Sequence, residues 1–125
     1  MTVYEFNGKF ECKNLCELNN VLSHRSSLNS NDFELRPDGE YPYLTILIKD
    51  KYACVHFYSD ENDCGHVAFA DKNNTPEYVE FNLGSENNKT KISKDIVISL
   101  DQAYEIANCF FKEHKMSNKI QWLDL

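Results

Sequence analysis

Apolar and polar residues alternate over much of the middle of the chain, which is the pattern of strands that bury one face. The alternation runs through residues 32–36, 43–49, 52–58, 66–70 and 78–83. Within the third of these segments, Ala53, Val55 and Phe57 share the apolar face. Because short polar turns join the segments, we predict an antiparallel β-meander with one face in solvent.

Two other segments have helical spacing. Residues 14–26 carry apolar side chains three and four positions apart, at Leu15, Leu18, Val21 and Leu22. A second helix is predicted to begin after Ser99, because Gln102 three residues later completes a capping box. Its apolar stripe consists of Leu100, Ala103, Ala107, Phe110 and Phe111.

The remaining segments complete the predicted fold. Residues 2–6 and 119–123 are expected to form short terminal strands, and residues 96–98 a brief extended piece. Residues 71–77 are expected to form a polar turn, and the polar stretch 84–95 a mobile loop. The pattern therefore predicts an α+β fold of two layers, an antiparallel β-meander sheet packed by two helices.

Length and composition fit one domain. The chain has 125 residues, of which 42% are hydrophobic and 13% aromatic, enough for one packed core. It has only four glycines and three prolines, unlike linkers and low-complexity chains. We expect residues 1–125 to form a single domain.

The charge balance restricts the partners. Thirteen basic and 20 acidic residues give a net charge of −7. Such a chain is repelled by phosphate backbones and anionic lipid but attracted to a basic protein surface. Only Arg25 and Arg36 offer the bidentate fork that suits phosphate. We therefore expect a basic protein partner, with no direct binding of nucleic acid or membranes.

The N-terminus does not show the charged and apolar regions of a signal peptide, and no apolar run approaches the roughly 20 residues of a membrane span. The five cysteines are an odd number, which suggests free thiols in a reducing compartment. We expect a cytoplasmic protein.

Cysteine and histidine recur as Cys54-x-His56 and Cys64-x-His66, which supply the ligand types of a Cys₂His₂ zinc site. If Phe57 and Val67 face the core together, Tyr58 pairs with His66 and Asp60 with Cys64. Cys54 then lies roughly 20 Å from Cys64 at the usual rise of a strand. One ion cannot bridge that span, so we expect no metal and no cofactor.

Catalysis requires a nucleophile beside a base. Cys54 and His56 project from the same strand face, and a pocket between the second helix and the sheet could use them. A small-molecule-binding or hydrolytic domain is thus the alternative function. The sequence has neither a nucleophile elbow nor a glycine-rich phosphate loop, and we expect a protein that is not an enzyme.

The solvent face of the meander combines tyrosines with acidic residues. Tyrosine gives contact area at low entropic cost, and carboxylates suit a basic partner, although aromatic residues also favour strands for structural reasons. The predicted contact residues are Tyr58, Asp60, Glu61, Asp63, Tyr78 and Glu80.

The C-terminal part of the chain resembles the immunity protein family one of bacterial polymorphic-toxin and contact-dependent growth inhibition systems. The resemblance rests on residues 96–103, on Phe110-Phe111 two turns later and on the segment 120–122 with its tryptophan. Upstream, the strands 44–48 and 52–58 match the family's order, so it covers roughly residues 40–123. The loop 115–118 departs from it, because the family has Gly and Pro there.

The resemblance implies a cytoplasmic antidote that inhibits a toxin by stoichiometric binding. The partner would be the C-terminal domain of a cognate toxin, basic and often a nuclease, whose active-site cleft is covered. The chain would be a monomer or form a 1:1 heterodimer with that toxin. Ala103 and Trp122 would be structural residues. The net charge of −7 independently suits such a partner.

Overall fold

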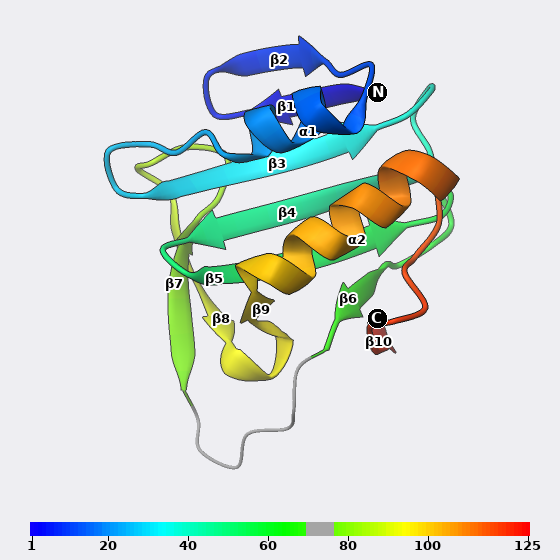
Figure 1. The fold of residues 1–125 in the computed structure, drawn as a ribbon. Coiled ribbons are helices and arrows are strands. Elements are labelled where there is room, and N and C mark those ends of the chain that lie inside the picture. The colour runs from blue at the N-terminus through cyan, green and yellow to red at the C-terminus, as the bar shows by residue number, and fades with distance from the viewer. Residues whose placement is uncertain (70–76) are drawn as a thin grey trace.

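Two helices lie on one face of an antiparallel sheet, so that the fold has the two layers predicted (Figure 1). The computed structural model describes residues 1–69 and 77–125. Within that part, the sheet order is β10-β6-β5-β4-β3-β1-β2, with β9 paired to β5. The strands of this order are β1 (Thr2–Glu5), β2 (Gly8–Glu11), β3 (Ser30–Arg36), β4 (Tyr43–Lys49), β5 (Tyr52–Tyr58), β6 (His66–Ala68) and β10 (Trp122–Asp124). The other elements are α1 (Leu15–Leu22), β7 (Tyr78–Asn82), β8 (Lys89–Ser93), the 3₁₀ turn η1 (Lys94–Ile96), β9 (Ile98–Ser99) and α2 (Leu100–Glu113).

The predicted meander is confirmed for β3, β4, β5 and β6, which pair in sequence order. Strands β4 and β5 have the predicted bounds and pair along their whole length. Ala53, Val55 and Phe57 are buried on the face beneath the helices, as their alternation indicated. The period of two was informative because this sheet face is buried along the whole of β5.

Both helices begin where side-chain capping was available. The Asn14 side chain accepts from the backbone N–H of Glu17 at 2.8 Å, and Ser99 and Gln102 form the predicted capping box. Helix α1 is shorter than the predicted 14–26, because Ser23 closes it by donating its hydroxyl to the Asn20 carbonyl. Helix α2 ends at His114, which adopts a left-handed conformation with φ 55°.

The core between the helices and the sheet contains Phe57 and Phe110, whose rings meet edge to face at 6.0 Å. Trp122 also packs on Phe57, with ring centroids 6.5 Å apart, and its indole N–H donates to the Ser117 carbonyl at 2.9 Å. The family-like tryptophan is therefore a structural residue in this fold.

The prediction of a mobile loop over residues 84–95 was wrong. Strand β8 lies within it and pairs with β7, and this hairpin is separate from the main sheet. It crosses the face of the sheet opposite the helices, where Val79 and Phe81 pack with Leu47 and Cys54 in a second core cluster. Strand β8 offered little apolar signal, because only Ile92 in it is a large aliphatic residue. Strand β7 was predicted correctly but does not continue the meander.

The predicted pairing of β5 with β6 was also wrong, by one residue. Phe57 lies opposite His66 and His56 opposite Val67, so Val67 belongs to the second cluster and not beside Phe57. A shift of one residue exchanges the faces of a strand. The sequence pattern could not reveal this shift, because β6 has apolar residues on both faces. Ala68 packs in the core on the helix side, and Val67 packs in the second cluster on the opposite face.

Strand β2 was missed, since all four of its residues are exposed at the edge of the sheet. The predicted strand 66–70 ends at Ala68. Residue 70 and most of the predicted turn 71–77 lie outside the described residues.

Candidate binding face

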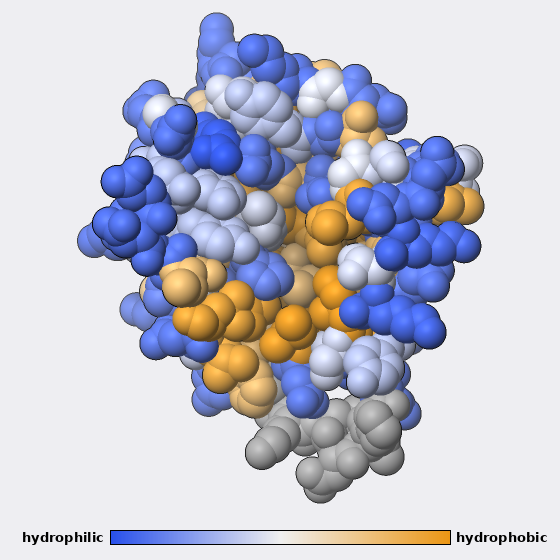
Figure 2. Space-filling view, turned by 180° about the vertical axis from the view of Figure 1, so that it is seen from behind, coloured by the Kyte–Doolittle hydropathy of each residue, from blue (hydrophilic) through white to orange (hydrophobic). Residues whose placement is uncertain are grey.

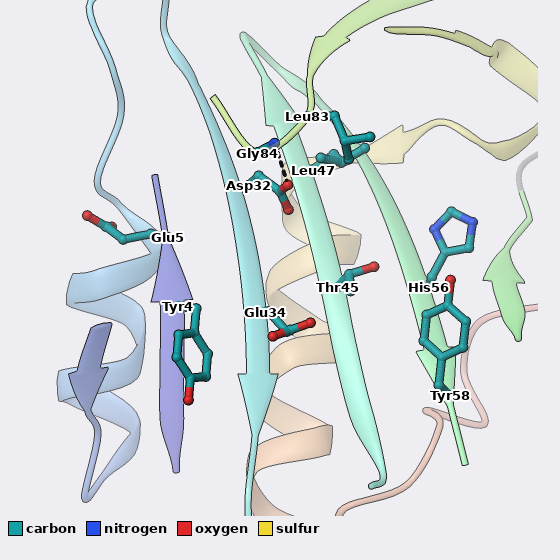
Figure 3. Close-up of a pocket in the computed structure, with 10 residues that line it drawn as sticks. All are labelled: Tyr4, Glu5, Asp32, Glu34, Thr45, Leu47, His56, Tyr58, Leu83 and Gly84. Carbon is teal, nitrogen blue, oxygen red and sulfur yellow. Dashed lines mark hydrogen bonds between the residues drawn. The ribbon is translucent and has the colours of Figure 1, made fainter. Parts of the chain in front are cut away.

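The sheet face opposite the helices is covered unevenly. The β7–β8 hairpin buries one part of it, and the rest is open to solvent. Figure 2 shows this face, with a hollow running along its middle and apolar side chains gathered mainly below and beside it. The open part contains a groove of about 450 Å³. We refer to it as the back groove; its lining residues are those drawn in Figure 3.

Strand alternation places the groove's side chains in rows. Residues Tyr4, Glu34, Thr45 and His56 are register partners on β1, β3, β4 and β5 and form one such row. Asp32 and Leu47 form the next row, and Leu83 and Gly84 close the groove from the end of the β7–β8 hairpin (Figure 3). The groove therefore joins segments from the N-terminal, central and hairpin parts of the chain.

The groove contains carboxylates but its histidine is neutral. Glu5, Asp32 and Glu34 line it. Burial lowers the pKa of His56, so this imidazole carries no charge at neutral pH. The floor is therefore acidic, and each carboxylate has a different set of partners.

Glu34 binds Arg36, whose Nε and Nη2 lie 3.0 and 3.1 Å from the two carboxylate oxygens. Glu5 is buried against His24 Nδ1 at 3.0 Å and accepts from the Asn31 amide at 3.4 Å. Asp32 accepts a hydrogen bond from the Gly84 backbone N–H at 2.8 Å. Burial raises the pKa of Asp32 above its ordinary value, although this hydrogen bond acts against the shift.

An aromatic wall borders the groove on the β5 side. Tyr58 stacks on Tyr43 with centroids 4.7 Å apart, and His56 lies parallel to Tyr58 at 6.3 Å. The guanidinium of Arg36 sits 4.2 Å above the Tyr43 ring. Burial raises the pKa of Tyr58, which is half-buried and remains neutral. Tyr4 stands at the opposite side, with 39% of its surface exposed.

The predicted contact residues fall into two groups. Tyr58 lines the groove, and Asp60 and Glu61 are exposed in the turn that follows β5. Tyr78 and Glu80 lie on the β7–β8 hairpin, where their neighbours Val79 and Phe81 face the sheet, so these two side chains point outward. Among the described residues, no hydrogen bond, ion pair or ring contact joins the two groups.

Asp63 holds the turn together. Its carboxylate accepts from the backbone N–H groups of Ser59 and Gly65, both at 2.9 Å, and from the Ser59 hydroxyl at 2.8 Å. His66 Nε2 lies 3.1 Å from the same carboxylate. The backbone hydrogen bonds lower the pKa of Asp63 to about 2. This carboxylate therefore orders the loop that displays Asp60 and Glu61.

Sequence reasoning missed Tyr4, Asp32 and Glu34. The alternation over 32–36 already placed Asp32 and Glu34 on the polar face of a strand, which was a usable signal. What it could not show is that β1 and β5 bring Tyr4 and His56 into the same row.

The residues of the suggested zinc set are divided between the two faces of the sheet. Cys54 and His56 face the back, whereas His66 contacts Phe57 on the helix side and Cys64 is exposed in the turn. Within residues 1–69 and 77–125, no group of three or more His, Cys, Asp or Glu side chains is placed to hold a metal ion.

The suggested Cys54–His56 pocket beside the second helix is not formed. Both side chains point away from α2, and Cys54 Sγ lies 3.9 Å from His56 Nδ1. Burial raises the pKa of Cys54 to about 12. Its thiol is therefore protonated at neutral pH, the opposite of an activated nucleophile.

In the described part of the chain, none of the helices is long and apolar enough to cross a membrane.

No protein-family model matches the chain. It is 27% identical over 122 residues to the double-stranded DNA deaminase immunity protein of Burkholderia cenocepacia strain H111, and the match covers 97% of both chains. This similarity covers almost the whole sequence, whereas the family resemblance covered roughly residues 40–123. It confirms the resemblance of this chain to the immunity proteins of bacterial toxin systems.

Proposed function

We propose that the chain neutralises a bacterial toxin domain by binding it one-to-one, without a cofactor and without catalysing a reaction. The observation that carries this proposal is the similarity to an immunity protein over 97% of both chains. The net charge of −7 supports a basic partner, because opposite charge speeds encounter and favours binding.

The toxin's chemistry is proposed from the relative. The relative's name specifies a deaminase of double-stranded DNA, whereas the family resemblance implies a nuclease. We propose a DNA deaminase as the toxin partner and keep a nuclease as the second candidate. Either activity requires a surface that binds the phosphate backbone, and such a surface is basic. An acidic inhibitor can occupy it through carboxylates that take the position of phosphates.

The proposed contact surface is the open part of the back face. Tyr58 would supply buried aromatic area, and Asp60 and Glu61 would pair with toxin lysines or arginines. Asp63 would act indirectly, by ordering their turn. Tyr78 and Glu80 would form a second contact on the β7–β8 hairpin, which flanks the groove.

We further propose that residues 1–125 act as one immunity-type domain in the cytoplasm, in a system of contact-dependent growth inhibition. The five cysteines are free thiols, which fits a reducing compartment.

Co-expression tests the function. The toxin domain encoded beside the gene for this chain would be induced in a susceptible bacterium, with and without the chain. Restored growth and a 1:1 complex with the inactivated toxin on size exclusion are expected. If the toxin still kills the cells and no complex forms, the proposed function is refuted.

Charge reversal tests the surface. The double variant Asp60→Lys/Glu61→Lys should weaken the complex, with part of the loss in the association rate. Glu105→Lys/Glu113→Lys is the matched control, because it changes the net charge by the same amount at two exposed residues of α2 on the opposite layer. Equal affinity of both variants and wild type would place the contact elsewhere.

The alternative of a hydrolytic Cys/His site is disfavoured by the state of Cys54. Iodoacetamide at neutral pH should modify the exposed Cys16 and Cys64 well before the buried Cys54. Fast labelling of Cys54 would restore that alternative.

A further inference from the structure

The back groove contains a carboxylate whose charge is not matched by a neighbour. Glu34 forms an ion pair with Arg36, and Glu5 lies within hydrogen-bond distance of His24. Within the described residues, Asp32 is paired with no basic side chain. In the part of the chain that the structure describes, the Asp32 carboxylate accepts one hydrogen bond, from the Gly84 backbone N–H to Oδ2, and Asp32 lines the groove (Figure 3). Burial of a carboxylate without a cation is unfavourable.

The aromatic walls of the groove suit a flat cation. Tyr4 and Tyr58 line opposite sides of the groove, and the neutral ring of His56 lies next to Tyr58. A guanidinium is more weakly hydrated than an ammonium and stacks on aromatic rings. The groove, at about 450 Å³, is open to solvent at the face of the sheet that the hairpin leaves uncovered.

The rim of the groove already shows this combination. Arg36 binds the carboxylate of Glu34 while its guanidinium lies 4.2 Å above the Tyr43 ring. A carboxylate and a tyrosine on neighbouring strands of this sheet are therefore spaced to hold one arginine. Asp32 on β3 and Tyr4 on the neighbouring strand β1 offer the same combination within the groove, and the rings of His56 and Tyr58 face them from β5, two strands away.

We propose that the back groove receives an arginine side chain from a basic loop of the toxin, with Asp32 as its counter-ion, the Tyr4 ring on the neighbouring strand beside it, and the His56 and Tyr58 rings as the far wall of the groove. This inference rests on the proposed toxin-binding function and adds to it a specific contact. The acidic turn 60–63 would attract the basic surface, and the groove would anchor it.

The test uses the inactivated toxin domain encoded beside the gene and the full-length chain. Asp32→Asn removes the charge and keeps an oxygen that can accept from Gly84. Its affinity should fall about ten- to a hundredfold, the usual cost of losing a charged hydrogen bond. Glu105→Gln makes the same change of charge on α2 and should alter the affinity less than about twofold.

A second variant reaches the groove without changing Asp32. Thr45→Arg places the chain's own guanidinium in the row between Glu34 and His56, where it should occupy the groove and exclude the toxin arginine. Circular dichroism and thermal melting establish that each variant is folded. If Asp32→Asn does not fold, the toxin affinity of Thr45→Arg alone tests the proposal. Wild-type affinity in the folded variants would overturn the proposal.

Double-mutant cycles identify the occupant. Asp32→Asn should be coupled to the loss of one toxin arginine and to no toxin lysine. Coupling to a lysine, or to no residue, would overturn the arginine assignment. If the free chain dimerises and Asp32→Asn makes it monomeric, the occupant is a second copy and the proposal fails. If wild type forms no complex with the toxin domain, the proposed function itself fails. If wild type binds the toxin domain and the groove variants bind it equally well, this inference alone fails.

Discussion

The two faces of the sheet are built differently. The face beneath α1 and α2 is closed by a continuous apolar core that includes Phe33, Phe57 and Phe110. The opposite face is closed only where the β7–β8 hairpin packs, through Val79 and Phe81. Beside that hairpin it carries carboxylates and tyrosines in an open groove. One face therefore contains most of the apolar core, and the other is partly open to solvent.

The difference explains why the polar residues lie where they do. A groove lined by ionisable groups opposes folding, because burial disfavours their charged forms. Asp32 illustrates this, since burial raises its pKa. The helix-side core can offset such a cost. Substitutions on each face should separate the contributions of the two faces to stability and to toxin binding, with effects that decrease from Phe110→Ala to Asp32→Asn.

Phe110→Ala should cause the largest loss of stability. Phe110 is fully buried against Phe57, and truncation removes apolar burial and leaves a cavity. We expect a loss of about 3–5 kcal/mol in the free energy of unfolding, measured by urea denaturation. Phe111→Ala, at a partly buried neighbour, is the control and should cost less. A loss below about 1 kcal/mol for Phe110→Ala would contradict the importance of this core.

Phe81→Ala tests the second face with the same chemical change. Phe81 is also fully buried, but in the described residues its hairpin has no strand pairing with the main sheet, so we expect the hairpin to open locally at a lower cost. We expect a smaller loss in the free energy of unfolding, about 3 kcal/mol. Amide hydrogen exchange should become faster in β7 and β8 while β4 stays protected. Equal acceleration in both would show that the two faces unfold as one unit.

Gly65→Ala should have a moderate effect that is centred on the groove wall. Gly65 has φ 108°, and a Cβ there would lie 2.7 Å from the Tyr58 ring. We expect a loss of about 1–3 kcal/mol from backbone strain and displacement of that ring. Gly39→Ala is a control with a positive φ but no atom within 4 Å of the added Cβ. Toxin affinity should fall for Gly65→Ala and stay unchanged for Gly39→Ala.

Asp32→Asn should have the smallest effect and the opposite sign. The folded-state pKa of Asp32 is raised above its ordinary value of 3.8, so ionised Asp32 destabilises the free protein. Protonated Asp32 does not carry this cost, so the wild type loses stability as the pH rises from below 3.8 through the folded-state pKa of Asp32. The variant should therefore melt at a higher temperature at neutral pH, with the difference vanishing in acid. A lower melting temperature at neutral pH would show that the bond to Gly84 outweighs the burial of the charge.

Local patterns in the sequence predicted most of the secondary structure, and the composition led to the prediction of a basic partner. The period of two defined 43–49 and 52–58, the Ser99–Gln102 pair defined the start of α2, and the net charge indicated a basic partner. Each of these signals depends on neighbours along the chain or on the composition as a whole, so no tertiary contact is needed to detect it.

Tertiary packing decided the rest. The β7–β8 hairpin left the meander and covered part of the back face, because Val79 and Phe81 found apolar partners in Leu47 and Cys54. The same packing allowed the one-residue difference in the β5–β6 register, since Val67 could be buried on either face. The groove joins Tyr4, Asp32 and His56 through strand pairing between distant segments. Which long-range pairings form depends on how both faces of the sheet are buried at once, and this is not encoded in any single segment.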